Sequence, residues 1–339
     1  MSLDPTGEVR LNFQKNAPQR PQRTIFEPRW RLTSLRELTL RRHGFPDHVI
    51  NDTVRRQMGH AGYILGRQSM SVHFEVSPGA GRRTVCWLVG VVLLGAAAPV
   101  AAAEFTIGLG AALAPDYEGS EDYEAAPNWV FRANNLYDPA TYVALQGTRL
   151  RSNFVPHPQL RAGLSGRFVG ERDDVDNGAV DDLDDTDAAL MLGAGIGRDF
   201  LPEPALGLTL AVDLVYDVAN DNGALVTPYL AYFNALPDTP WSVGLELSTT
   251  WADEDYMSEQ FGINGNNAAR SGLDQFDADE GFKDVGLGGQ VSYRFTDSWS
   301  TTVAGQYKLL VEDAADSPIV DDEGSEHQFV LGATVNFHF

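Results

Sequence analysis

Cysteine is almost absent from this sequence of 339 residues, since Cys86 is the only one. A single cysteine excludes an intramolecular disulfide framework and a cysteine-ligated metal site. Basic residues become scarce after residue 103, because residues 104–339 carry 11 Lys and Arg against 40 Asp and Glu, a net charge of −29. A surface of that sign repels phosphate backbones, so we predict no nucleic-acid partner. The 33 glycines and the 10% of aromatic residues argue against a disordered acidic tail, and we expect a folded acidic domain.

Catalytic motifs are also missing from residues 104–339. The segment has three histidines, His157, His327 and His338, but no serine motif of the nucleophile-elbow kind, no metal-spaced His/Glu set and no phosphate-binding glycine loop. The acidic segment 173–185 offers oxygen ligands for calcium, yet an EF-hand register started at Asp173 puts a valine at the third position. We therefore predict a non-enzymatic protein without cofactor or metal, in which this segment is a solvated loop. Loose binding of divalent cations by the loop is the alternative.

An apolar run at residues 85–95 follows two arginines and precedes a stretch of small residues. A basic flank, a short apolar core and small residues at the −3 and −1 sites are the parts of a secretory signal peptide. We predict a signal peptide at residues 70–103, with Ala101 and Ala103 at the −3 and −1 sites of cleavage. A membrane anchor over residues 84–103 is the alternative, although six alanines and a proline weaken it as a span.

Residues 1–69 precede the predicted signal peptide, where a functional domain is not expected. They hold 12 Lys and Arg and show no clear apolar period. We interpret them as a non-structural extension or as the product of a misassigned start, with Met58 or Met70 as the initiator. An unusually long targeting region is the alternative.

From residue 105 onward, apolar residues recur at every second position, which is the period of a strand. In residues 285–295, for example, five apolar residues alternate with small and polar ones. Several such segments run 11 to 14 residues, whereas a soluble strand has about 5–6 and a tilted membrane-crossing strand about 9–11. Aromatic residues at the segment ends suit the two interfacial girdles of a membrane barrel. The pattern therefore predicts membrane strands rather than a soluble sandwich.

The alternating segments predict an all-β fold, a transmembrane antiparallel β-barrel of twelve strands that occupies residues 104–339. The strands are expected at residues 105–114, 127–133, 139–146, 148–154, 159–170, 187–200, 205–217, 224–235, 240–251, 282–295, 298–311 and 326–339. With both termini in the periplasm, the periplasmic links are short and four outer links are long, as bacterial barrels require. The long links, together with the loop-edge residues Asp187 and Glu326, carry about 29 of the 40 acids of this segment. Ten strands is the alternative, because the second to fourth segments are the least regular.

Several segments resemble the MipA/OmpV family of outer-membrane proteins. The clearest is Ala114-Pro-Asp-Tyr-Glu-Gly-Ser-Glu-Asp-Tyr123, which is similar to the first-loop signature of that family. The others are Tyr256-Met-Ser-Glu-Gln-Phe-Gly-Ile263, Ser271-Gly-Leu273, Gly281-Phe-Lys-Asp284, Tyr307-Lys-Leu-Leu310, Asp313-Ala-Ala-Asp-Ser-Pro-Ile-Val320 and the terminal Phe339. Their order and spacing span nearly all of residues 104–339.

The resemblance implies location in the outer membrane and, as a first hypothesis for function, a non-enzymatic scaffold that joins a murein hydrolase to a murein synthase. It also implies two alternatives, a porin-like channel for small solutes and a surface adhesin that acts through the acidic loops. The resemblance also implies the two periplasmic enzymes as partners. The charge of the acidic loops independently predicts that divalent cations hold them near lipopolysaccharide in the outer-membrane lipid. Short periplasmic turns offer little surface for a stable interface, which counts against the scaffold.

Two kinds of candidate functional residue follow from the barrel. Phe339, a terminal aromatic on the last strand, resembles the signal that the outer-membrane insertion machinery reads, and an ordinary girdle residue is the alternative. Polar residues on inward faces would line the lumen, where they either tune ion selectivity or pair with one another and fill a narrow barrel. The main lumen candidates are Arg161, Arg167, Asp213, Glu246 and Arg294.

Overall fold

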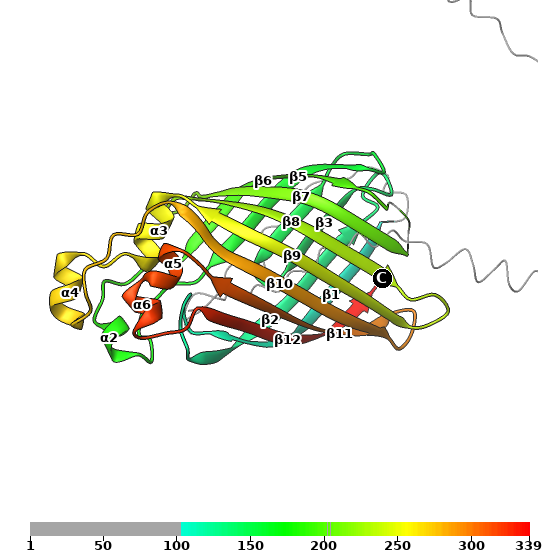
Figure 1. The fold of residues 1–339 in the computed structure, drawn as a ribbon. Coiled ribbons are helices and arrows are strands. Elements are labelled where there is room, and N and C mark those ends of the chain that lie inside the picture. The colour runs from blue at the N-terminus through cyan, green and yellow to red at the C-terminus, as the bar shows by residue number, and fades with distance from the viewer. Residues whose placement is uncertain (1–102, 202, 204) are drawn as a thin grey trace, which may run out of the picture. The chain divides into compact units, whose positions relative to one another are not determined.

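The computed structural model describes residues 103–201, 203 and 205–339. The predicted extension at residues 1–69 and the predicted signal peptide, Ala101 included, lie outside the described residues, apart from Ala103, which directly precedes the first strand. Within the described part, twelve antiparallel strands form a closed barrel in which each strand pairs with its neighbours in sequence and the first pairs with the last (Figure 1). The prediction of an all-β, twelve-stranded barrel is confirmed.

Each strand lies within a few residues of its predicted position. The strands are β1 (Glu104–Pro115), β2 (Tyr123–Asn134), β3 (Tyr142–Gln146), β4 (Arg149–Asn153), β5 (Leu160–Val169), β6 (Ala189–Asp199), β7 (Leu206–Asp217), β8 (Ala224–Ala235), β9 (Trp241–Ala252), β10 (Gly281–Arg294), β11 (Trp299–Leu310) and β12 (His327–His338). The pairing of β1 with β12 closes the barrel. At the end of this seam, the N–H groups of Phe105 and Phe339 each donate to the carbonyl of the other residue, at 2.9 and 3.0 Å.

The barrel wall has its apolar side outward and its polar side inward. Leu109 is 69% exposed and Ile196 is 64% exposed, whereas Glu246 on an inward face is only 2% exposed. A soluble monomer rarely exposes so continuous an apolar surface. Lipid-facing strands show this arrangement because hydrocarbon surrounds the wall. None of the helices in the described residues is long and apolar enough to cross a membrane.

One position breaks the alternation along β10. The pairing of β10 with β9 shifts between Phe282 and Asp284, which marks a β-bulge at Lys283. A bulge adds one residue to one strand and turns the following side chains to the other face. Strict alternation would place Lys283 outside with Val285, but its side chain is fully buried.

The long outer links contain short helices, which the sequence did not predict. They are α2 (Gly178–Asp181), α3 (Glu254–Phe261), α4 (Gly265–Ser271), α5 (Asp313–Asp316) and α6 (Pro318–Asp321). Side-chain caps begin several of them: the carboxylate of Asp253 accepts from Tyr256 N–H before α3, and the amide oxygen of Asn264 accepts from two N–H groups before α4. Such caps satisfy backbone donors that a helix start otherwise leaves unpaired. We call the four long outer links, residues 116–122, 170–188, 253–280 and 311–326, the cap.

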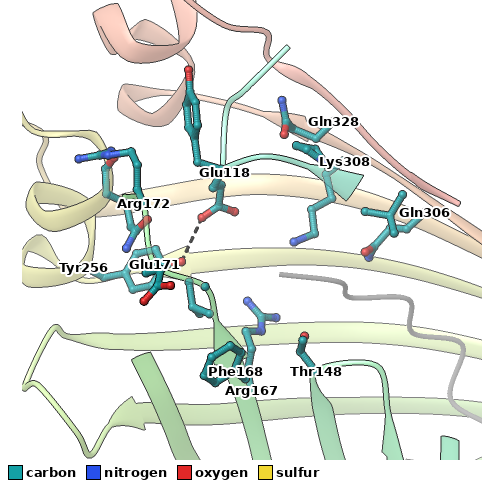
Figure 2. Close-up of a pocket in the computed structure, with 16 residues that line it drawn as sticks. Glu118, Thr148, Arg167, Phe168, Glu171, Arg172, Tyr256, Gln306, Lys308 and Gln328 are labelled. Carbon is teal, nitrogen blue, oxygen red and sulfur yellow. Dashed lines mark hydrogen bonds between the residues drawn. The ribbon is translucent and has the colours of Figure 1, made fainter. Parts of the chain in front are cut away.

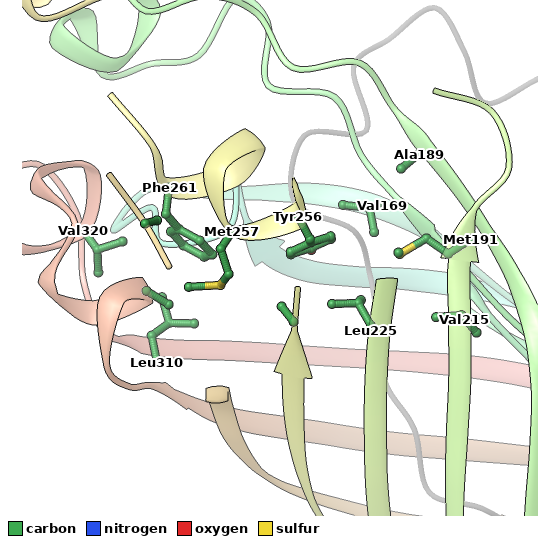
Figure 3. Close-up of a cluster of buried hydrophobic side chains, with 13 residues drawn as sticks. Val169, Ala189, Met191, Val215, Leu225, Tyr256, Met257, Phe261, Leu310 and Val320 are labelled. Atoms are coloured by element: carbon green, nitrogen blue, oxygen red, sulfur yellow. The ribbon is translucent and has the colours of Figure 1, made fainter. Parts of the chain in front are cut away.

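The cap packs onto the barrel end through a buried apolar cluster (Figure 3). Strand ends contribute Val169, Ala189, Met191, Val215, Leu225, Ala252 and Leu310, and the cap contributes Tyr256, Met257, Phe261, Ala278, Ala314 and Val320. Because the strand ends come from β5 to β9 and from β11, the cluster reaches from one wall of the barrel to another. A second cluster, which includes Tyr117, Val180, Ile263 and Ile319, holds the outer links to each other. The cap is therefore a folded layer across the loop-side end of the barrel.

Segment 173–185 is part of this layer. Its acidic side chains are exposed, as expected of a solvated loop. In contrast, Val175, Val180 and Leu183 are buried in the second cluster, and Asn177 caps α2. Among residues that the structure describes, no group of three or more His, Cys, Asp or Glu side chains is arranged to hold a metal ion.

Candidate functional site

The middle of the lumen contains a buried charge cluster built around Arg151 of β4. Its guanidinium Nε lies 2.8 Å from Asp213 Oδ2 on β7, and its Nη1 lies 3.0 Å from Glu246 Oε2 on β9. The same guanidinium lies 3.7 Å from the ring centre of Tyr229 on β8. Two of the predicted lumen candidates, Asp213 and Glu246, thus meet at one arginine. Buried charges require such partners, because an isolated ion in an apolar interior is strongly unfavourable.

Two other predicted candidates lie toward the end of the barrel that holds the chain terminus. Arg161 Nη2 lies 2.7 Å from Asp199 Oδ1, and its Nη1 donates to the Tyr142 hydroxyl at 3.2 Å. Arg294 Nη1 donates to the carbonyl oxygen of Asp297 at 3.0 Å. Each arginine is held by a neighbour in the wall or in a turn.

At the loop-side end, a second charge cluster joins the cap to the barrel. We call Glu118, Tyr256, Lys283 and Asp284 the latch. Lys283 Nζ lies 2.8 Å from Asp284 Oδ2 and forms an ion pair with Glu118, while the Tyr256 hydroxyl donates to Glu118 Oε2 at 3.0 Å. Burial by itself would raise the pKa of Glu118, but the positive charges of Lys283 and Lys308 outweigh it, so the pKa lies below its usual value. Burial raises the pKa of the Tyr256 phenol, which stays a hydrogen-bond donor.

A cavity of about 50 Å³ lies beneath the latch (Figure 2). Its lining includes Glu118 and Tyr256 from the cap, Thr148 at the tip of the β3–β4 hairpin, and Arg167, Gln306 and Lys308 from the barrel wall. The predicted lumen candidate Arg167 lies here, far from Arg161 on the same strand. Arg172 also lines the cavity, and its Nη1 donates to the Gln260 carbonyl oxygen at 2.9 Å.

The sequence did not single out Arg151, Glu118 or Lys283 as site residues. The role of Arg151 depends on strands that are distant in sequence, and the bulge hides the inward direction of Lys283. One signal was present, however, because Glu118, Tyr256, Lys283 and Asp284 all belong to the segments that carry the family resemblance. Those segments are far apart in the chain and meet in the latch.

Phe339 lies at the opposite end of the barrel from the cap. The residue is 61% exposed, and its ring stacks on the rings of Phe105 and Phe337, whose centres lie 5.6 and 5.8 Å away. The position fits an interfacial aromatic girdle. Its role as an assembly signal stays a prediction.

Comparisons with known proteins give one family. The family model described as "MltA-interacting protein MipA" matches residues 107–339. A search of curated proteins gives no match.

Among solved structures, the chain is similar to several barrels. The COG4313 outer membrane channel from Pseudomonas putida F1 shares 16% identity over 72% of this chain and 97% of that chain, with a TM-score of 0.36. The N-terminal β-barrel domain of Pseudomonas aeruginosa OprF shares 14% identity over 53% of this chain and 96% of that chain, with a TM-score of 0.23. OprG from Pseudomonas aeruginosa shares 10% identity over 70% of this chain and 96% of that chain, with a TM-score of 0.22. Similarities at these sequence identities and TM-scores give no information about activity.

Proposed function

Because the chain belongs to the MipA family, we propose that this outer-membrane β-barrel is a non-conducting scaffold that binds a murein hydrolase and a murein synthase at its periplasmic end. The observation that carries the proposal is the apolar cluster under the cap. An open pore needs a continuous aqueous path, whereas this cluster lies across the outer end of the lumen. The name of the family, MltA-interacting protein, supplies the class of partner.

The paired charges inside the barrel support the same proposal. Arg151 bridges β4 to β7 and β9 with ion pairs of 2.8 and 3.0 Å, so it ties separate walls together across the lumen. Asp213 and Glu246 are at most 6% exposed. Side chains that serve a water-filled channel are expected to face water rather than one another.

Two neighbouring turns at the terminus-side end offer a docking surface. We call residues 135–141 and 154–159 the ledge. The Tyr137 hydroxyl donates to the carbonyl oxygen of Phe154, and the Asn153 side-chain amide donates to the Ala140 carbonyl oxygen at 2.7 Å. Tyr137 is nevertheless 63% exposed. A pre-ordered surface with an exposed tyrosine suits a protein interface, because little further ordering is needed on binding.

The test is retention of purified partners on the immobilised, folded full chain. We expect it to retain a lytic transglycosylase of the MltA type and a penicillin-binding synthase, and we expect Tyr137→Ala to reduce retention severalfold. Phe200→Ala is the matched control, since Phe200 is a 48% exposed aromatic in another turn. If the wild-type chain retains neither enzyme, the scaffold proposal is wrong. If Tyr137→Ala and Phe200→Ala lower retention equally, the ledge is not the docking surface.

A small-solute channel is the second candidate, and a separate observation favours it. Buried polar atoms of Asn128, Gln306, Thr334 and Asn336 have no hydrogen-bond partner among the described residues. Such atoms in native proteins often bind ordered water, so they mark a narrow wet path along β2, β11 and β12. Single-channel recording in planar bilayers separates the two candidates. Discrete conductance steps from the wild-type chain would favour the channel, and silence from a folded barrel supports the scaffold.

A further inference from the structure

Arg132 is a basic residue near the terminus-side end of the barrel, two residues before β2 ends at Asn134. Its side chain makes two polar interactions with described residues. Its Nε donates to Asn134 Oδ1 at 2.8 Å, and its guanidinium carbon lies 5.3 Å from the centre of the Tyr142 ring. The other two nitrogens, Nη1 and Nη2, donate to no described residue, and Nη2 is buried. One edge of this guanidinium is therefore unused by the described chain.

The charge of Arg132 has no counter-ion in the part of the chain that the structure describes. A guanidinium stays protonated in proteins, and a buried charge without a partner is strongly unfavourable. No described carboxylate is among the groups whose charge acts on Arg132, whereas a second cation, Arg161, is one of them. Glu104, which lies opposite Asn134 on β1, is exposed and forms no ion pair with Arg132.

The carboxylate at this end of the barrel is already used by the other arginine. The Tyr142 ring has Arg132 at 5.3 Å and Arg161 at 5.7 Å, measured from the ring centre to each guanidinium carbon. Asp199 Oδ2 accepts from Arg161 Nε at 2.8 Å, and Asp199 Oδ1 lies 2.7 Å from Arg161 Nη2. The Thr209 hydroxyl also donates to Asp199 Oδ1, at 2.6 Å. Two guanidiniums thus share one ring and one carboxylate, which leaves the charge of Arg132 over.

The residues that pair with Arg132 on the neighbouring strands cannot supply an anion. Thr106 lies opposite on β1, and its hydroxyl shares a hydrogen bond with His338 Nδ1 at 2.9 Å. Ala144 lies opposite on β3 and has no polar side chain. The group that balances Arg132 must therefore come from outside the described residues.

We propose that Arg132 binds a carboxylate that arrives from the periplasmic end, through its Nη1–Nη2 edge. The planar fork of a guanidinium matches a carboxylate with two parallel hydrogen bonds. Arg132 is half-buried and lies three residues before the ledge begins, so the ligand reaches it without crossing the lumen. The carboxylate belongs either to a small organic acid or to an acidic group of a protein docked on the ledge. Only the second source rests on the scaffold function proposed above.

The test measures thermal unfolding of the full chain, refolded in detergent micelles, by the loss of β-sheet circular dichroism. The probe is sodium acetate at a series of concentrations and constant ionic strength, and acetamide is its neutral counterpart. A ligand that binds only the folded state raises the unfolding temperature as its concentration rises. We expect this rise with acetate and not with acetamide. Arg132→Gln should need at least about tenfold more acetate for the same rise, because it removes the charged, two-bonded contact.

Two further variants complete the design. Asn134→Asp is nearly isosteric and puts a carboxylate of the chain itself within reach of Arg132, since Asn134 Oδ1 already lies 2.8 Å from Arg132 Nε. It should unfold at a higher temperature than the wild type without acetate and should not respond to acetate, which keeps the test decisive if Arg132→Gln does not fold. Arg198→Gln changes an exposed arginine at the same end of the barrel and should respond like the wild type. The proposal is wrong if the wild type does not respond, if acetamide acts equally, or if Arg132→Gln or Asn134→Asp keeps the full response.

Retention of the two murein enzymes on the immobilised chain separates the two sources of the carboxylate. If Arg132→Gln lowers retention severalfold and acetate competes with the enzyme, the carboxylate belongs to the docked partner. If Arg132→Gln loses the acetate response but retains the enzymes normally, the ligand is a small organic acid. A wild-type chain that retains neither enzyme contradicts the scaffold alone, because the acetate response is measured without them.

Discussion

Glu118 is a charged residue that joins the cap to the barrel wall. It comes from the first outer link and binds Lys283 of β10 and the Tyr256 hydroxyl of α3, so one carboxylate joins three parts of the chain. Its pKa lies below the usual 4.5 in the folded protein. A carboxylate with a lowered pKa stabilises the fold fully above its unfolded value, and that stability is lost as pH falls through the folded value.

We therefore expect the cap to loosen in acid, below about pH 4.5. Limited proteolysis of the cap at a series of pH values measures this directly. Glu118→Gln should be more susceptible than the wild type at pH 7 and should lose most of the pH dependence, because it cannot ionise. An unchanged pH profile in Glu118→Gln would assign the acid sensitivity to another group.

Arg151 is the corresponding residue in the lumen. Replacement by methionine leaves Asp213 and Glu246 buried without their cation, so we expect a loss of about 3–5 kcal/mol in the free energy of unfolding. The loss is measured as a lower temperature for conversion of the compact gel band to the unfolded one. Arg270→Met is the control, because the Arg270–Asp184 pair is about half exposed and such pairs contribute at most about 1 kcal/mol. Equal shifts in the two variants would contradict the role of the buried cluster.

Helix α3 supplies three of the six cap residues in the apolar cluster at the outer end of the barrel. Its inner face carries Tyr256, Met257 and Phe261, each at most 3% exposed in the cluster that spans the barrel end. Phe261→Ala should lower the free energy of unfolding by about 3–5 kcal/mol, because it removes buried contacts and leaves a cavity under the cap. If the cap is what prevents conduction, this variant should show conductance steps that the wild type lacks. If Phe261→Ala makes the cap more susceptible to proteolysis but the barrel still shows no conductance, the charge cluster around Arg151 is what prevents conduction.

At the scale of the whole molecule, the β1–β12 seam that closes the barrel ends at the last residue. Phe339 exchanges both backbone hydrogen bonds with Phe105 and stacks on its ring. Deletion of Phe339 should reduce surface assembly while secretion into the periplasm continues, and quantitative surface labelling measures the difference. Phe295→Ala is a matched control, because Phe295 is a 54% exposed aromatic at the same end. If the deletion variant assembles normally, Phe339 is an ordinary residue of the aromatic girdle and not an assembly signal.

The sequence alone determined the strands, their number and the two faces of the wall. Period-two alternation indicates which side chains meet lipid and which face the lumen. It is the basis on which Arg161, Arg167, Asp213, Glu246 and Arg294 are predicted to line the lumen. The same pattern placed the short hairpin of β3 and β4.

Tertiary structure decided what those inward residues do. The partner of Arg151 depends on how β4 faces β7 and β9 after closure, which no local pattern encodes. Lys283 is buried because a bulge shifts the register of β10 against β9, and pairing rather than composition sets that register. The cap helices are short, and their stability comes from apolar contacts with distant strand ends rather than from their own residues. Local periodicity thus determined the wall, and long-range packing determined the closed end and the charge pairs.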